Sequence, residues 1–377
     1  MLERRAFGLI RIAGLLLAAG FVLCRLLPFG TALAAPPPGL PERPPALKQA
    51  GVLKGDRAFD KSVFLADRGF GSATHIISNP TREARLGIAG TGGAVFVSAA
   101  GEVTSRVKFS SQVSFVEFVD VEKDGVWEFL NRGGQGWGDA SLLDHEGRRL
   151  WTFGAKPVTA VNDMAAGDLD GDGVLDFVVG FNGADGVRRL DKDGKVQWQE
   201  PDGNVWHVEI VDTKGEGTAE IVHSNVGGQI SVRDQNGKLL RRSKPGTYFS
   251  SFSVCRWPTP KDLPHLLNVG DDVISLYDFD GTTMATLEAP HASMLGSAHG
   301  ASVRFKTGEP SHFAVVVEFS LWRVSVLYLY NHEHELVFQE VIADKCLSLA
   351  SLPRDKSDVE ELLVGGTGKV WKYTAAK

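Results

Sequence analysis

The chain has few cysteines and little helical periodicity. Only 3 Cys occur among its 377 residues, so a disulfide framework is excluded and stability must come from packing or from bound ions. After residue 50 no long stretch repeats apolar residues with a helical period, which excludes a helical bundle. The formal net charge of −6 offers no basic face, so we expect no nucleic-acid partner.

Catalytic signatures are also missing. No G-x-S-x-G elbow occurs, and the stretch GGTGKV at 365–370 lacks the upstream Gly and the final Ser or Thr of a phosphate-binding loop. The sequence HEHE at 332–335 occupies a predicted hairpin tip, where solvated imidazoles are favoured over a zinc site. Cys255 and Cys346 fall in or near predicted first strands, which favours buried free thiols. We therefore name no catalytic residue.

Residues 1–34 have the features of a secretory signal peptide. They contain a basic start, an apolar run from Ile12 to Cys24 and the small-residue pattern TALAA. The run is shorter than the roughly 20 apolar residues that a spanning helix needs, and an uncleaved N-terminal anchor is the alternative. RRAF partly matches a twin-arginine export signal, so the export route stays open. Residues 35–50 are a predicted Pro-rich linker and residues 51–377 a single domain. The sequence predicts an exported protein, periplasmic or extracellular, with no membrane span after cleavage.

One hairpin recurs about every 45 residues, as expected for a repeat protein. Its copies include LLDHEGRRLW, RLDKDGKVQW and VRDQNGKLL, and their turns carry Gly101, Gly147, Gly194, Gly237 and Gly281. A glycine is favoured there because a short hairpin usually ends in a residue with positive φ. A late copy, LYNHEHELVF, has His334 at this position.

Each hairpin is preceded by an apolar strand and a Gly-rich turn, so each repeat contains four strands. Antiparallel units of this length are the blades of a β-propeller. Seven such units fit between residues 74 and 377, and the last one stops after three strands. We expect residues 61–67 to supply its fourth strand and so close the ring. The predicted fold is all-β, a seven-bladed β-propeller of four-stranded antiparallel blades, and we expect a monomer.

The stretch GDLDGDGVLDFVVG, residues 167–180, has alternate carboxylates in the turn between two predicted strands. Hard cations such as Ca²⁺ take this arrangement of oxygen ligands. The candidate ligands in this loop are Asp168, Asp170, Asp172, Asp176 and the carbonyl of Val174, and those of the preceding repeat are Asp120, Glu122, Asp124 and Glu128. An EF-hand is excluded because Val179 stands where its twelfth-position Glu is required. In the next repeat Lys214 replaces a ligand, so we expect no ion there.

GDLDGDGVLDFVVG resembles the calcium loop of the FG-GAP and VCBS repeat family, which includes integrin α-subunit propellers and many exported bacterial proteins. This resemblance implies a structural Ca²⁺ cofactor. The hairpins LDHEGRRLW and LDKDGKVQW are similar to the repeats of PQQ-type propellers, in which a Trp docks neighbouring blades. The resemblance implies this role for Trp151 and Trp198, while Arg241 takes the position in the following repeat.

The loops that enter first strands should meet the second-to-third-strand turns around the ring's axis. Aromatic, amide and imidazole side chains in these segments suit sugars or peptides. The candidates for ligand binding are Trp137, Phe181, Asn182, Trp206, His207, Tyr248 and His299. The favoured function is an exported, non-catalytic, calcium-stabilised binding or scaffold module for a protein or glycan. The alternatives are a carbohydrate-active enzyme resembling polysaccharide lyases and a PQQ-type oxidoreductase, and fold alone does not decide between them.

Overall fold

The structure is a computed structural model that describes residues 41–55, 58–79, 81, 84–98, 101–111, 113–133, 139–154, 160–225, 227–245, 252–258, 263–354 and 358–376. The chain divides into two compact units, Met1–Gln49 and Ala50–Lys377. The described part of the first unit holds one short 3₁₀ helix, η1 (Pro45–Leu47). In the described part of the chain, no helix has the length and apolar character needed to cross a membrane. The predicted signal peptide lies outside the described residues.

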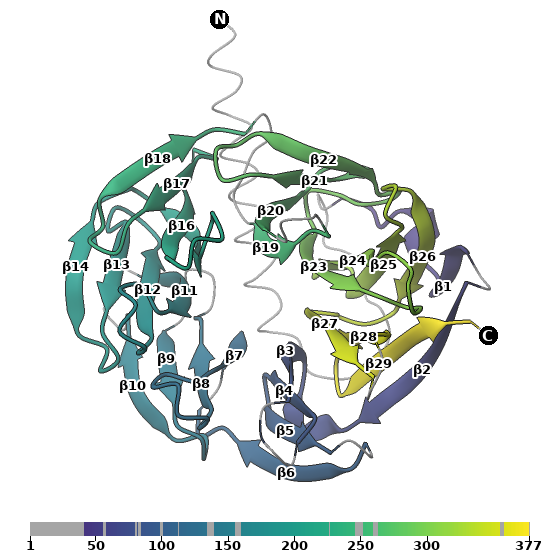
Figure 1. Cartoon of the computed structure of the whole chain (residues 1–377), viewed down its shortest axis with the longest axis horizontal. Coiled ribbons are helices and arrows are strands. Elements are labelled where there is room, and N and C mark those ends of the chain that lie inside the picture. Colours follow the sequence, from purple (N-terminus) through teal and green to yellow (C-terminus); the bar gives the residue numbers. More distant parts are fainter. Residues whose placement is uncertain are drawn as a thin grey trace, which may run out of the picture. The chain divides into compact units, whose positions relative to one another are not determined.

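The second unit is the predicted seven-bladed propeller, and Figure 1 looks down its ring of sheets. Blade 1 consists of β3 (Ala73–Ser78), β4 (Leu86–Gly90), β5 (Gly93–Val97) and β6 (Val103–Lys108). Blade 2 consists of β7 (Val116–Val119), β8 (Glu128–Asn131), β9 (Ala140–Leu143) and β10 (Arg149–Phe153). Blade 3 consists of β11 (Val161–Gly167), β12 (Asp176–Phe181), β13 (Val187–Leu190) and β14 (Val196–Glu200). Blade 4 consists of β15 (Val205–Val211), β16 (Glu220–Asn225), β17 (Ile230–Arg233) and β18 (Leu239–Ser243).

The remaining blades follow the same antiparallel order. Blade 5 consists of β19 (Ser253–Arg256), β20 (Pro264–Val269), β21 (Val273–Tyr277) and β22 (Thr283–Glu288). Blade 6 consists of β23 (Ser297–Val303), β24 (His312–Phe319), β25 (Val324–Tyr330) and β26 (Leu336–Ile342). Blade 7 consists of β27 (Ser348–Pro353), β28 (Glu360–Gly365), β29 (Lys369–Ala375) and an N-terminal strand, β2 (Phe59–Ala66). A short 3₁₀ helix, η2 (Arg68–Phe70), leads from β2 into blade 1. The first strand of each blade is the innermost one (Figure 1).

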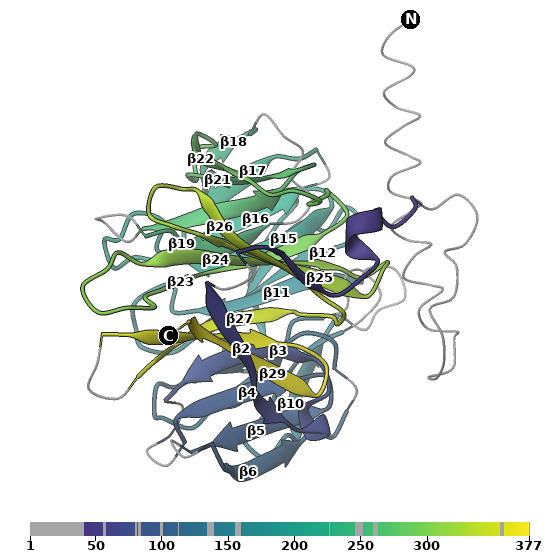
Figure 2. The ribbon, with the colours of Figure 1, turned by 90° about the vertical axis from the view of Figure 1, so that its right-hand side faces the viewer.

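The ring closes as the sequence predicts, because β2 pairs antiparallel with β29 along its whole length. The sequence did not predict β1 (Gly51–Lys54), which pairs with β26 and gives blade 6 a fifth strand. The N-terminal segment therefore covers the outer edges of two successive blades (Figure 2). Such coverage protects β26 and β29 from pairing with other chains.

The recurrent hairpin has the geometry that its glycines indicate. The five turn glycines have φ between 77° and 86°, and His334 has φ 69° in the equivalent turn. A β-bulge follows each of these turns, within the first three residues of the outer strand. The residue four positions after the turn glycine, or after His334, then reaches the neighbouring blade. We call it the docking position.

Tryptophan at the docking position binds the next blade, as the resemblance to PQQ-type propellers implies. The Trp151 indole N–H donates to the Lys192 carbonyl at 2.9 Å, and the Trp198 indole N–H donates to the Gln235 carbonyl at 2.8 Å. In both cases the acceptor lies in the hairpin turn of the following blade. The Trp151 ring packs directly against Gly194. A Cβ at this position would lie only 3.1 Å from the ring, so a larger residue would crowd it.

Apolar cores lie between adjacent blades. Leu130 and Leu142 of blade 2, for example, belong to one buried cluster with Phe177 and Val179 of blade 3. Several central strands are buried on both faces, so they are mainly apolar rather than alternating. Every residue of β12 is buried.

Candidate functional site

The topology divides the loops of the ring between two faces. The links from the outer strand of one blade to the inner strand of the next share one face with the second-to-third-strand turns. We call this the connection face. The acidic loops between first and second strands lie on the opposite face with the hairpin turns. This follows from the antiparallel order within each sheet, in which successive strands reverse direction.

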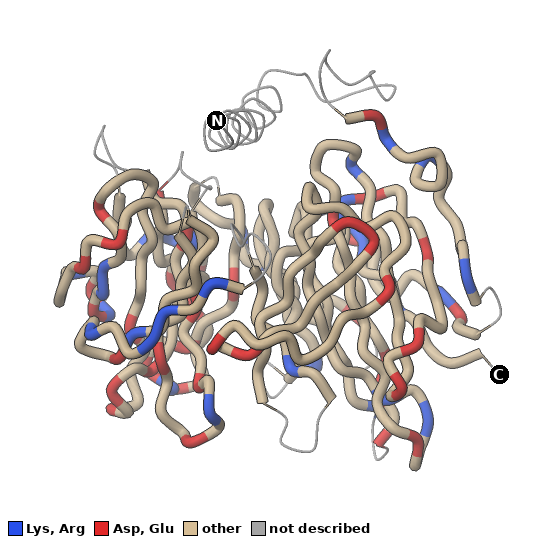
Figure 3. Tube along the Cα trace, turned by 90° about the horizontal axis from the view of Figure 1, so that it is seen from above, with Lys and Arg blue, Asp and Glu red and all other residues tan. Residues whose placement is uncertain are grey.

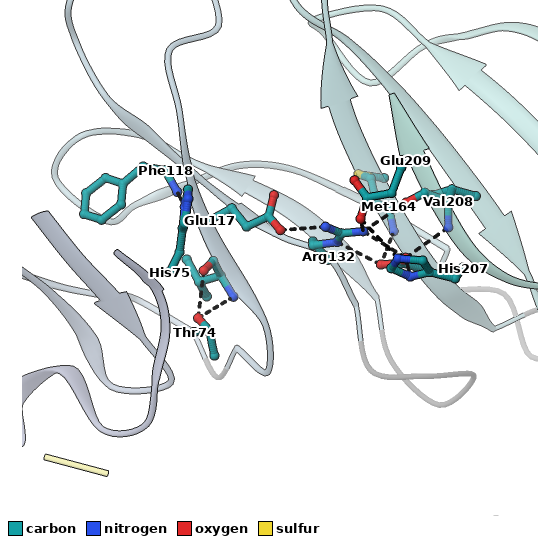
Figure 4. A network of polar contacts seen from close by, with 11 residues as sticks. Thr74, His75, Glu117, Phe118, Arg132, Met164, His207, Val208 and Glu209 are labelled. Carbon is teal, nitrogen blue, oxygen red and sulfur yellow. Dashed lines mark hydrogen bonds and ion pairs between the residues drawn. The ribbon is translucent and has the colours of Figure 1, made fainter. Parts of the chain in front are cut away.

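Five charged side chains from three neighbouring blades form an ionic network beside the axis. We call it the axial cluster: Glu117 of β7, Arg132 just after β8, Asp163 of β11, and His207 and Glu209 of β15. Figure 4 shows the guanidinium of Arg132 at its centre. Arg132 binds Asp163 through Nε and Nη2, both at 2.9 Å, and binds Glu117 through Nη1 at 2.6 Å. Its Nη2 also lies 3.1 Å from Glu209 Oε1.

Asp163 is the most fully bonded member of the axial cluster. Besides Arg132 and His207, its carboxylate accepts the backbone N–H of Met164 at 2.9 Å and that of Val208 at 3.1 Å. Burial alone would raise the pKa of Asp163, but the charges of Arg132 and His207 hold it well below its usual range. Asp163 therefore stays ionised and anchors β11 to β15.

His207 and His299, both near the axis, differ in charge at neutral pH. Burial alone lowers the pKa of His207, but attraction by Asp163 and Glu209 outweighs it and raises the pKa of His207 to about 9. For His299 of β23, burial and then the charges of Arg132 and His207 lower the pKa to about 4. At neutral pH the first imidazole is a cation and the second is neutral. His75 of β3 is neutral too, since burial lowers its pKa and its Nδ1 accepts the Phe118 N–H at 2.9 Å.

The structure places the predicted ligand-binding residues in different environments. Trp137 and Tyr248 lie outside the described residues. Phe181 is a core residue, 1% exposed, with the Arg188 guanidinium 4.5 Å from its ring centre. His207 belongs to the axial cluster, and His299 lies within range of its charges.

Asn182 belongs to a chain of amides between blades 3 and 4. Asn162 donates to Asn204 at 2.9 Å, and Asn204 donates to Asn182 at 3.1 Å. Trp206 follows in the next strand, and its buried indole N–H has no hydrogen-bond partner among the described residues. The amides of this chain thus bond to one another at the junction of blades 3 and 4.

Sequence reasoning missed four members of the axial cluster: Glu117, Arg132, Asp163 and Glu209. Three of them lie on apolar innermost strands, in the stretches FVEFV, VNDMA and VWHVEIV. These residues could have been found from the sequence as charged residues within predicted inner strands, because buried charges require partners.

The acidic loop of blade 3 brings three predicted calcium ligands together. Asp168, Asp170 and Asp172 each place a carboxylate oxygen within 4.8 Å of the others. Gly171 and Gly173 donate their N–H groups to Asp168 at 2.8 Å and 3.1 Å, which shapes the turn. These three side chains fit part of an oxygen coordination shell for Ca²⁺.

The fourth carboxylate of that loop has a different partner. Asp176 is bound by Nε and Nη2 of Arg189 at 3.0 Å and 2.8 Å, and Arg189 reaches Asp170 as well. Lys123, from the loop of blade 2, lies 2.5 Å from Asp168. Figure 3 shows acidic and basic segments close together on the side of the ring that holds these blades, at the left. Arg189 and Lys123 thus neutralise carboxylates that are also the candidate ligands of a calcium ion.

The other two acidic loops are arranged differently. Asp120 accepts the backbone N–H groups of Asp124 and Gly125, while Glu122 pairs with Lys192 of blade 3. Among the described residues, the blade 2 carboxylates do not converge as a group of three or more. In blade 4, Lys214 lies 3.6 Å from Glu220, as its place in the sequence suggested.

A rigid apolar projection lies on the connection face between blades 5 and 6. Met294 and Leu295, in the link from β22 to β23, are 66% and 44% exposed. The Met294 N–H donates to Asp271 at 3.3 Å, and the His291 N–H donates to Asp272 at 2.8 Å. His291 and Asp272 have φ of 71° and 58°. Non-glycine residues adopt this conformation only where the surroundings impose it.

The same link is also bonded to the outer strands of blade 6, β25 and β26. Tyr328 and Gln339 both donate to the Pro290 carbonyl, at 2.9 Å and 2.8 Å. The backbone of the link that carries Met294 and Leu295 is thus bonded to both neighbouring blades. Pre-organisation of this kind lowers the entropy lost on binding.

Both cysteines of the described region are buried and free, as predicted. Burial raises the pKa of the Cys255 thiol to about 12 and raises that of Cys346 still further. Neither thiol is therefore activated as a nucleophile.

Comparison with solved structures supports the propeller fold. BBS1N in complex with ARL6DN is similar with a TM-score of 0.55 and 13% identity, covering 87% of this chain and 98% of that one. Raptor of Chaetomium thermophilum has a TM-score of 0.57 and 12% identity, covering 85% of this chain and 30% of that one. The Pan2 WD40 domain of Neurospora crassa has a TM-score of 0.52 and 12% identity, covering 85% and 96%. No family model matches the chain, and no curated protein matches it significantly.

Proposed function

We propose that the chain is an exported, non-catalytic propeller that binds a protein partner at its connection face. The observation that carries this proposal is the apolar pair Met294 and Leu295, exposed on a link that hydrogen bonds to both adjacent blades hold in place. Exposed apolar side chains on a rigid loop are typical of interaction surfaces. The BBS1N propeller, which shares this fold, is described in complex with the protein ARL6DN, and this supports the proposal.

The charge states beside the axis favour binding over catalysis. His207 is protonated at neutral pH and paired with two carboxylates, so it does not serve as a base. Asp163 is held ionised by its partners, so it does not serve as an acid. These groups form a fixed polar surface.

Glycan binding is the second candidate, supported by the amides of Asn162, Asn182 and Asn204 beside the Trp206 indole. Amides and aromatic rings are common in sugar sites. A polysaccharide panel tests this candidate when it is assayed for binding and for new unsaturated ends, which would indicate a lyase. An absorption spectrum of the purified protein tests the PQQ alternative.

Calcium and export are part of the proposal. The loop of Asp168, Asp170 and Asp172 would hold Ca²⁺ as a structural ion, on the face opposite the proposed partner. The resemblance to FG-GAP and VCBS repeats supports this assignment. The features of residues 1–34 support export.

Partner capture tests the main proposal. The double variant Met294→Ser/Leu295→Ser should lose about tenfold in affinity for a captured partner, because a few central apolar contacts dominate most interfaces. Met284→Ser is the matched control, since Met284 is 52% exposed but lies on the outer strand β22. Both variants should melt at the wild-type temperature. If both variants lose capture equally, or if neither variant loses it, the Met294–Leu295 surface is ruled out.

A further inference from the structure

The axial cluster has more negative than positive groups. Arg132 and the protonated His207 face the carboxylates of Glu117, Asp163 and Glu209, which leaves one negative charge. The nearby imidazoles of His75 and His299 are neutral at pH 7 and do not offset it. A partly buried cluster with excess charge favours a counter-ion.

The unshared oxygens belong to the two most exposed carboxylates of the cluster. Glu117 uses Oε1 to bind Arg132, and Glu209 uses Oε1 to bind both Arg132 and His207. Their Oε2 atoms have no partner among the described residues. The side chains of Glu117 and Glu209 are 32% and 22% exposed, whereas that of Asp163 is 11% exposed and fully bonded. The excess charge therefore lies where a ligand can reach it.

We propose that Glu117 and Glu209 accept a basic side chain, arginine foremost, from the protein partner. This inference rests on the proposed function and names the chemistry of the partner. A guanidinium suits the site because the cluster already binds that of Arg132, which donates two parallel hydrogen bonds to Asp163 and one to Glu117. The net charge of −6 on the chain would also speed the approach of a basic partner.

The small number of free carboxylate oxygens favours a guanidinium over a metal ion. Within the described ranges, the group of carboxylates whose oxygens converge within 4.8 Å is Asp168, Asp170 and Asp172, and neither Glu117 nor Glu209 belongs to such a group. A metal ion requires several oxygens at one point. A planar guanidinium has five donors and can pair with only two carboxylates.

Calorimetry with short peptides tests the inference directly. The probe is acetyl-Gly-Arg-Gly-amide, whose only charge is the guanidinium, and its control is the citrulline peptide of the same shape without that charge. At low ionic strength the arginine peptide should bind wild-type protein about tenfold more tightly than the citrulline peptide. Equal binding of the two peptides, or binding of neither, overturns the proposal without reference to any variant.

Variants then locate the binding. Glu117→Gln should weaken arginine-peptide binding about fivefold. Glu216→Gln removes the same charge from an exposed loop on the opposite face and should leave binding unchanged. Unchanged binding in Glu117→Gln, with a wild-type melting temperature, contradicts the proposed site. Displacement of the peptide by magnesium chloride, but not by sodium chloride of equal ionic strength, would assign the site to an inorganic cation instead.

The two proposals fail separately. Partner capture that depends on Met294 and Leu295 but shows no preference for the arginine peptide refutes the role of Glu117 and Glu209, and the proposed function stands. Arginine selectivity without any capture of a protein by the wild type refutes the proposed function.

Discussion

The charge on His207 should make the stability of the ring depend on pH. Its Nδ1 contacts the Asp163 carboxylate, and its Nε2 lies 3.1 Å from Glu209 Oε1. Both contacts favour the imidazolium. Replacing His207 by Gln removes the charge but keeps a hydrogen-bonding side chain of similar length.

The size of the effect follows from the pKa. The folded chain raises the pKa of His207 to about 9, from an ordinary value of 6.5. The difference corresponds to about 3 kcal/mol of folding free energy. Because the folded-state pKa is the higher one, this stabilisation is fully present below pH 6.5 and is lost as the pH rises through 9.

Urea unfolding at pH 6 and pH 10 measures the contribution. Other groups also titrate over this range, so the informative quantity is the stability of wild type minus that of His207→Gln at each pH. This difference should fall by about 3 kcal/mol between pH 6 and pH 10. A difference that is the same at both pH values would show that His207 is not a paired cation, and the charge count of the axial cluster would fail with it.

Three further predictions concern the blades. Trp198→Ala should destabilise the ring by about 2–3 kcal/mol in urea unfolding, because a half-buried indole and its hydrogen bond to the Gln235 carbonyl are lost; unchanged stability would contradict the docking role of the indole. Calcium at about 100 times its dissociation constant should stabilise the fold by about 2.7 kcal/mol, and Asp170→Ala should abolish this gain; equal melting in calcium and in chelator would exclude a structural ion. A chain that begins at Gly71 lacks β2, leaves β29 as an open edge and should aggregate, whereas one that begins at Ala50 should stay monomeric; light scattering decides between them.

The blades were predictable because their signal is local and repeated. Five hairpins carry a turn glycine and a sixth carries His334 in its place, and the strand order follows from the antiparallel connections. The closing strand was predictable for a different reason, since the last repeat lacked one strand. By contrast, β1 has four residues and a partner nearly at the other end of the chain, so no local pattern indicates it.

The axial cluster was not predictable because its partners come from separate blades. Arg132 binds residues 15, 31 and 77 positions away. No spacing motif describes such a set, since the ring and not the sequence brings the side chains together. Phe181 shows the converse difficulty. A large aromatic residue at a strand end fits either a rim or a core, and the packing of Phe181 against the preceding blade places it in a core.

The docking position shows how one geometry accommodates different chemistry. Trp151 and Trp198 use an indole N–H and a flat ring against the next hairpin, whereas Arg241 pairs at 3.1 Å with Asp280 of blade 5. In blade 6 the position is Phe338, whose ring lies 5.3 Å from that of Phe59, the first residue of the strand that closes blade 7. Each side chain leaves the same bulge and meets the neighbouring blade. The turn and the bulge therefore recur from blade to blade. The side chain at the docking position varies with the groups that the neighbouring blade presents to it.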